Sequence, residues 1–209
     1  MLPALALLLL SYLLGSLSGS LLLGRLRGVD IRAAGSGSAG GTNALRTQGA
    51  WFALGTVLID VGKGALAAWL ALRFLPAGSH AAWAYACAFA AAIGHVWPLY
   101  HGFRGGKGAA TLVGGLALLW PQAIVPALIV WVLALLWTGY VGLSTILAGL
   151  AVLVAALAWQ VETTRMAYAF AIAAFLVFTH RANLARLRRG VEPRFERVRV
   201  LGRLLDRTP

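Results

Sequence analysis

Acidic residues are scarce in this chain, and charge of either sign is uncommon. Six Asp and Glu residues stand against 18 Lys and Arg residues among 209, so the formal net charge is +12. Charged residues make up 11% of the sequence and hydrophobic residues 60%, whereas soluble domains average about 25% charged residues. This composition excludes an ordinary soluble domain. It predicts an all-α polytopic membrane protein of one domain, residues 1–209, with 180–209 as a basic tail.

Cysteine is limited to Cys87, and the residue patterns of several kinds of active site are missing. A lone cysteine forms no internal disulfide, and no spacing indicates a metal site, so Cys87 is expected to be a small packing residue. No Ser-His-Asp set or pair of carboxylates can be assembled from the polar segments. An enzyme built from this sequence is therefore expected to need no metal, no cofactor and no covalent protein intermediate.

Long apolar runs account for most of the chain, and a membrane span needs about 20 such residues. The first run, Met1–Gly24, is uncharged, which argues against a cleaved signal peptide and for a first span. The fourth would make a helix of roughly 43 Å, longer than the hydrocarbon core of about 30 Å, and it contains Pro121 and Pro126. The runs are 1–24, 51–75, 81–99, 109–137, 141–160 and 166–179.

The arginines decide how the fourth run crosses the membrane, because basic loops stay in the cytoplasm. Four arginines lie in Arg25–Arg46 and nine in Arg181–Arg207. Only a break near Pro121, with two crossings, puts both clusters inside and the uncharged turn Pro76–Ser79 outside. We therefore predict seven spans, some of them short, with the N-terminus outside and the C-terminus in the cytoplasm. The polar segments then share the cytoplasmic face: 24–50, 94–111 and the tail from His180.

The first of these segments contains GSGSAGGTNALR, Gly35–Arg46. Its glycines let the backbone approach a ligand closely, and a nest of N–H groups suits an anion. Thr42 or Asn43 is expected to cap the helix that follows, which would place an anion at a helix N-terminus with Arg46 one turn further on. A flexible loop between two helices is the alternative reading.

The second segment is GHVWPLYHGFRGGKGAAT, Gly94–Thr111. Its GGKG resembles a phosphate loop but fails as a Walker A motif, because His101 replaces the first glycine and Gly108 replaces the Ser or Thr that binds magnesium. What remains is glycine amides and one ammonium around a phosphate. Lys107 is one of only two lysines beside sixteen arginines, which hints at a specific role for a compact charge.

The third segment is HRANLARLRRGVEPRFE, which begins at His180 directly after the last apolar run. Asn183 lies one turn later on the same helical face. Both side chains could bind an anion or orient a hydroxyl, whereas the neighbouring arginines could be topology signals alone.

Two charged residues, Asp60 and Lys63, lie inside an apolar run and must face the bundle interior or water. Their i,i+3 spacing allows a pair on one helix face, so a structural ion pair is the favoured interpretation. His95, at the end of the third run, is also expected to be structural.

Together these segments resemble the bacterial membrane glycerol-3-phosphate acyltransferases that use acyl phosphate as donor. GSLSGSLLLGRLRGVDIR is similar to that family's first span, GSGSAGGTNALR to its first motif, FRGGKGAAT to its second and HRANLARLRRGVE to its third. LIDVGKG and GHVWP also match. The resemblance implies a seven-span enzyme of the bacterial inner membrane that acylates the sn-1 hydroxyl of glycerol 3-phosphate (G3P) on the cytoplasmic side. The products would be lysophosphatidic acid and phosphate.

The resemblance also assigns roles to residues. The catalytic candidates are Ser36, Arg46, Lys107, His180 and Asn183. The candidates for substrate and phosphate binding are Gly35, Gly37, Thr42, Asn43, Arg104, Gly105, Gly106, Gly108, Thr111 and Ser144. Asp60, Lys63, His95 and Glu192 are expected to be structural. The chain departs from the family pattern at Ser38, Ala39, Arg104, Gly139 and Gly142, which puts the role of position 38 in doubt.

The implied chemistry suits the residues available. Acyl phosphate brings its own leaving group, so the protein needs to supply positioning and charge stabilisation. The hydroxyl proton goes either to His180 or to the donor's own phosphate, and the phosphate is favoured because no acidic residue is placed to orient and support a histidine base. The partners expected are the two substrates and the lipid bilayer, with no nucleic acid and no obligate protein partner. A transporter for an anionic metabolite is the alternative function, but this sequence shows few intramembrane charges and no internal repeat.

Overall fold

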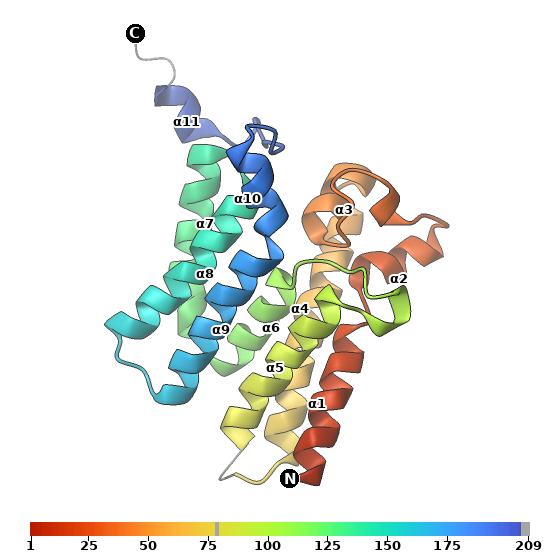
Figure 1. Ribbon diagram of the computed structural model, residues 1–209, viewed down its shortest axis with the longest axis vertical. Coiled ribbons are helices and arrows are strands. Elements are labelled where there is room, and N and C mark those ends of the chain that lie inside the picture. The colour runs from red at the N-terminus through yellow and green to blue at the C-terminus, as the bar shows by residue number, and fades with distance from the viewer. Residues whose placement is uncertain (78–79, 206–209) are drawn as a thin grey trace. The chain divides into compact units, whose positions relative to one another are not determined.

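The structure, a computed structural model, describes residues 1–77 and 80–205. Every regular element in these ranges is an α-helix or a short 3-10 helix (Figure 1), which confirms an all-α membrane protein. The chain divides into two compact units, Met1–Pro121 and Gln122–Pro209, and each is described by itself. Half of the predicted turn Pro76–Ser79, namely residues 78 and 79, lies outside the described residues.

The first unit is organised around α4 (Ala50–Phe74), which packs against α1, α2, α3, α5 and α6. The unit also includes two short 3-10 helices, η1 between α2 and α3 and η2 between α5 and α6. Figure 1 shows the α-helices around α4. The other elements are α1 (Leu2–Gly15), α2 (Gly19–Leu26), η1 (Ile31–Ala33), α3 (Gly41–Gln48), α5 (His80–Val96), η2 (Leu99–His101) and α6 (Ala109–Leu119).

Small residues let these helices approach closely, as is common where helices pack in membranes. A Cβ atom added at Gly114 of α6 would overlap the carbonyl of Val61 on α4. One added at Gly15 of α1 would overlap Ala91 on α5. Cys87 of α5 is fully buried, as expected of a packing residue.

The second unit contains three longer helices in sequence, with α8 packed against both α7 and α9. The short helix α10 contacts α8 and α9, and α11 contacts α7. Their bounds are α7 (Ile124–Thr138), α8 (Val141–Ala158), α9 (Thr163–Thr179), α10 (Arg181–Arg188) and α11 (Val200–Leu205). The 3-10 helix η3 (Pro121–Ala123) spans the boundary between the units.

The predicted break in the fourth apolar run is confirmed. Helix α6 ends at Leu119, Trp120 leaves helical geometry with φ −156° and ψ 67°, and η3 begins at Pro121. Pro126 lies in the first turn of α7, where a missing N–H costs no helical hydrogen bond. The fourth run is therefore two helices of 11 and 15 residues.

The number of membrane crossings follows only in part from helix length. Four helices of the described residues are long and apolar enough to cross, or six if each bent pair, α1–α2 at 47° and α9–α10 at 53°, is one span. Helix α6 is a shorter apolar helix. The seven-span topology and the sidedness of both termini stay predictions.

Candidate functional site

The first motif folds around the side chain of Asn43, which is 1% exposed. Its Oδ1 accepts a hydrogen bond from the N–H of Ser36 at 2.8 Å. Its Nδ2 donates to the carbonyls of Ile31 and Ala34 at 3.0 and 3.1 Å. Because both amide hydrogens are donated to carbonyls of the segment before α3, Asn43 organises the loop. Its role in binding a substrate stays a prediction.

The predicted helix cap at Thr42 or Asn43 is wrong. Helix α3 begins at Gly41 with Gly40 as its N-cap, so both predicted caps lie inside the helix. Position 35 requires glycine for two reasons: its φ is +64°, and a Cβ there would overlap Oδ1 of Asn43. The physical reason for the error is that Asn43 serves the loop before the helix rather than the helix itself.

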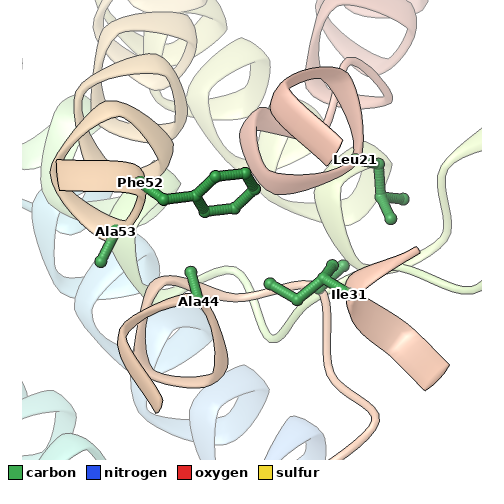
Figure 2. Packing of buried hydrophobic residues seen from close by; sticks show 6 residues of the cluster. Leu21, Ile31, Ala44, Phe52 and Ala53 are labelled. Carbon is green, nitrogen blue, oxygen red and sulfur yellow. The ribbon is translucent and has the colours of Figure 1, made fainter. Parts of the chain in front are cut away.

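An apolar floor supports this motif (Figure 2). Leu21, Ile31, Ala39, Ala44, Phe52 and Ala53 form one buried cluster. In Figure 2 the ring of Phe52 and the side chains of Ala44 and Ile31 point into the same interior, from α4, α3 and η1 respectively. Above this floor, Ser36 and Arg46 are exposed, so the two catalytic candidates of the motif are accessible to a ligand.

The first and second motifs are hydrogen-bonded to each other. The N–H of Ala39 donates to the carbonyl of Gly105 at 3.3 Å, and the hydroxyl of Ser20 donates to the carbonyl of Ala39 at 2.9 Å. The structure therefore brings GSGSAGGTN and GGKG together within the first unit. Ala39, one of the departures from the family pattern, is buried where the two motifs meet.

Arg32, which the sequence analysis did not single out, fastens the same two segments. Its Nη1 donates to the carbonyls of His101 and Arg104, both at 2.9 Å. Its Nε and Nη2 donate to the carboxylate of Asp30, the ion pair measuring 2.8 Å. Arg32 lowers the pKa of Asp30 to about 2, first through the hydrogen bonds of its guanidinium and then through that of its backbone N–H. The signal available was a charged pair, Asp30 and Arg32, beside an otherwise glycine-rich loop.

The GGKG loop does not present all of its amides to a ligand. The N–H of Gly105 donates to Val96 and that of Gly106 to His95, each at 3.1 Å. This corrects the expectation that these two amides form a phosphate cradle. Gly108 takes a left-handed conformation, φ +86°, as the N-cap of α6. Lys107 therefore lies at the N-terminal end of an 11-residue helix, where the helix dipole and unpaired N–H groups favour an anion.

Thr111, another predicted phosphate-binding residue, lies on α6 in the interior of the first unit. Its side chain is fully buried, and a Cβ added at Gly64 on α4 would overlap its carbonyl. The residue therefore belongs to the contact between α4 and α6, and its role in phosphate binding stays a prediction.

The buried ion pair between Asp60 and Lys63 is present as expected, at 2.8 Å. His95 joins it: Nδ1 lies 2.8 Å from Nζ of Lys63 and 3.3 Å from Oδ1 of Asp60. The pair also reaches the break between α1 and α2, where Gly19 donates its N–H to Asp60 and Lys63 donates to the carbonyl of Leu17. Sequence reasoning found the pair from its i,i+3 spacing but not its link to His95, 32 residues further along.

The third motif belongs to the second unit and is described within it. His180 lies at the bend between α9 and α10, and its Nδ1 is 2.9 Å from the carbonyl of Leu176. A carbonyl only accepts, so Nδ1 carries the proton and Nε2 the lone pair. In the neutral ring, Nε2 is therefore the nitrogen that can accept a proton.

Asn183 and Glu192 form a second network in this unit. Nδ2 of Asn183 donates to Glu192 at 2.6 Å, and Nε of Arg186 donates to the same carboxylate at 2.7 Å. A Cβ at Gly142 would come within 2.7 Å of the Asn183 amide nitrogen. The departure at Gly142 therefore makes room for Asn183.

Two other predicted positions on α7 and α8 have local roles. Gly139 ends α7 with φ +73°, and its carbonyl accepts from the N–H of Phe195 at 2.9 Å. The hydroxyl of Ser144 is buried and donates to the carbonyl of Tyr140 at 2.9 Å. Ser144 is thus engaged with its own helix rather than presented to a ligand. The described part of the chain contains no group of three or more His, Cys, Asp or Glu side chains that could hold a metal ion.

The comparisons with known proteins all identify the same family. The family model for glycerol-3-phosphate acyltransferase matches residues 5–190. The glycerol-3-phosphate acyltransferase of Symbiobacterium thermophilum is 40% identical over 186 residues, which cover 88% of this chain and 91% of that protein. The Brucella suis enzyme of the same name is 43% identical over 188 residues, covering 88% and 90%.

Solved structures extend the likeness to three dimensions. The crystal structure of PlsY (YgiH), an integral membrane glycerol 3-phosphate acyltransferase, in its glycerol 3-phosphate form has a TM-score of 0.86 and 31% identity. It covers 95% of this chain and 98% of PlsY. The lysophosphatidic acid form of PlsY gives a TM-score of 0.85 at the same identity and coverage. The matches in sequence and in structure span nearly the whole chain, and the chain belongs to the glycerol-3-phosphate acyltransferase family.

Proposed function

We propose that this chain transfers a fatty acyl group from acyl phosphate to the sn-1 hydroxyl of G3P, giving lysophosphatidic acid and phosphate. The observation that supports this most is the hydrogen bond between Ala39 and Gly105. It connects the loop that bears Ser36 and leads into α3, the helix that bears Arg46, to the segment that bears Lys107 at the N-terminus of α6. One anionic substrate can then meet both cations.

The phosphate of G3P is assigned to Lys107 and Arg46. Lys107 supplies a compact charge and three donors, and the N-terminus of α6 adds the field of its dipole. Arg46 supplies a planar fork of donors that suits a phosphate. Ser36, whose backbone is fixed by Asn43, offers a hydroxyl beside them. These groups orient G3P, which is the main contribution required when the acyl donor is already activated.

The reaction forms a bond between the sn-1 oxygen and the acyl carbon and breaks the bond between that carbon and the phosphate oxygen. The phosphate departs with the bonding electrons. The hydroxyl proton goes to one of two acceptors: Nε2 of His180 or the departing phosphate. Within the second unit, Nδ1 of His180 lies 2.9 Å from the carbonyl of Leu176, a contact that leaves Nε2 as the acceptor of the neutral ring. Asn183 is assigned to orient a polar group of the substrates.

In the experiment, purified protein is incubated with EDTA, G3P and one acyl donor. The donors tested in parallel are palmitoyl phosphate, acyl-CoA and acylated acyl carrier protein. We expect lysophosphatidic acid from palmitoyl phosphate alone. Product from acyl-CoA or acyl carrier protein without product from acyl phosphate would overturn the donor assignment. The absence of product from every donor would overturn the activity itself.

We also place the enzyme in the bacterial cytoplasmic membrane with its site facing the cytoplasm. In a Cys87→Ala background, single cysteines at Arg189 and at Ala77 report the two predicted sides. A membrane-impermeant maleimide applied to intact cells should label the cysteine at 77 and not the one at 189. Labelling of both, or the reverse pattern, would contradict this topology.

A further inference from the structure

Three ionisable side chains meet in the interior of the first unit. Asp60, Lys63 and His95 are 1%, 5% and 3% exposed. Burying charges costs several kcal/mol per ion before pairing offsets the loss. Asp60 and Lys63 already neutralise each other's charge, so charge balance does not require His95 at this position.

The contact with Lys63 sets the proton on His95. An ammonium group only donates, and Nζ lies 2.8 Å from Nδ1. This contact is shorter than the 3.3 Å between Nδ1 and Oδ1 of Asp60, so we assign Nδ1 as the acceptor of the Lys63 ammonium, which leaves the ring proton on Nε2. The cluster thus fixes both the rotation of the imidazole and its tautomer.

The opposite edge of the ring faces the GGKG loop. A Cβ atom added at Gly106 would overlap Nε2 of His95 and lie 3.0 Å from Cε1 and 3.1 Å from the carbonyl of Ala39. The N–H of Gly106 also donates to the carbonyl of His95 at 3.1 Å. His95 therefore contacts Gly106 through both its backbone and its ring, and Gly106 fits there because it has no side chain.

Lys107 follows Gly106 directly, so a displacement of Gly106 moves the ammonium that the proposed function assigns to the phosphate of G3P. We infer that the cluster of Asp60, Lys63 and His95 positions the GGKG loop, with His95 as a positioning residue for G3P binding. The inference rests on the proposed function for its substrate. Its structural content is a chain of contacts that runs from Lys63 through the imidazole to Gly106.

Two substitutions separate this role from that of a purely structural charge cluster. In His95→Asn the amide oxygen lies near the place of Nδ1 and still accepts from Lys63, but the edge facing Gly106 is removed. In His95→Gln the amide lies near the place of Nε2 and keeps that edge, but the acceptor for Lys63 is lost. A structural role predicts that Gln is the more damaging change, and a positioning role predicts that Asn is.

The measurement is steady-state kinetics with G3P varied at saturating acyl donor. We expect His95→Asn to raise KM for G3P about 10-fold with kcat within about 3-fold of the starting enzyme, and His95→Gln to have the smaller effect on KM. We expect Gly106→Ala to raise KM for G3P strongly in the native background. Beside His95→Asn, where its methyl group has room, the fold increase in KM should be at least about 10-fold smaller. The inference is overturned if the effects of Gly106→Ala and His95→Asn on KM are independent, or if His95→Gln raises KM for G3P more than His95→Asn does.

Two further measurements keep the test decisive. If the unmodified protein makes no lysophosphatidic acid, the proposed function fails, and the same cycle of Gly106 and His95 variants is read through the thermal unfolding midpoint. Coupling between the two sites then supports the positioning contact, and its absence overturns it. If neither His95 variant folds, Gly106→Ala alone serves: a raised KM for G3P in a folded protein supports the contact, and an unchanged KM overturns it.

Discussion

Replacing Arg32 with alanine is expected to loosen the segment that carries GGKG, although Arg32 is not itself a proposed substrate ligand. The side chain donates to the carbonyls of His101 and Arg104 from one nitrogen, at 2.9 Å each. Hydrogen bonds from a charged donor contribute about 1.5–3 kcal/mol each. Arg32 is 21% exposed, so solvent reduces their strength, and we take about 2 kcal/mol for the two together.

This magnitude translates into two observables. For a chain of this size, about 2 kcal/mol lowers the unfolding midpoint by roughly 4–8 °C. Activity should fall mainly through KM for G3P, because the catalytic candidates remain and only their mutual placement is relaxed. The assays are thermal unfolding in detergent and kinetics with G3P varied.

Arg25→Ala is the matched control, since Arg25 is an exposed arginine of the same segment and its removal changes the net charge equally. It should leave both values close to those of the native enzyme. If Arg32→Ala and Arg25→Ala give the same KM and the same midpoint, the reasoning is refuted, because the loss would then come from charge rather than from the two carbonyl contacts.

Three further predictions concern the loops and the third motif. Asn43→Ala removes three hydrogen bonds of the Ser36 loop, one buried and two partly buried, and should lower stability by about 2–4 kcal/mol with loss of activity. Denaturant unfolding and the acylation rate measure these effects; an active, equally stable variant would contradict the assigned role. Gly142→Ala brings a methyl group against Asn183 and should cost about 1–3 kcal/mol and reduce kcat, whereas an unchanged kcat would show that Asn183 can move without consequence. The pKa of Asp30 is lowered from 3.8 to about 2, so its contribution to stability is complete above about pH 4 and is lost as the pH falls toward 2. Unfolding midpoints between pH 5 and 2 should therefore decline less steeply in Asp30→Asn, and equal slopes would contradict the pairing.

Composition and spacing were sufficient for the features that depend on nearby residues. The apolar runs indicated helices in a membrane, Pro121 marked the break between α6 and α7, and the i,i+3 spacing of Asp60 and Lys63 indicated their pair. Each of these depends on the local chain or on the solvent. The family resemblance, which the comparisons confirm, came from motifs of the same local kind.

The features that could not be predicted depend on partners distant in sequence. Arg32 donates to carbonyls 69 and 72 residues away, and the periodicity of the sequence does not indicate which backbone carbonyl will accept a hydrogen bond. Gly105 and Gly106 are indistinguishable in sequence from glycines that present their amides to phosphate, yet both amides are donated to carbonyls of the last two residues of α5. Asn43 was misread as a helix cap, because its bonds go backward to the loop.

The link between Ala39 and Gly105 has a consequence for protein engineering. Ala39 is held on both sides of its α-carbon, by Gly105 at its N–H and by Ser20 at its carbonyl, so the two loops and the start of α2 form one exchangeable module. A chimera that takes the first loop from a relative while keeping its own second loop would pair two surfaces that were not selected together. Exchange of substrate or donor preference between members of this family should therefore transfer both loops with α2 as a single cassette.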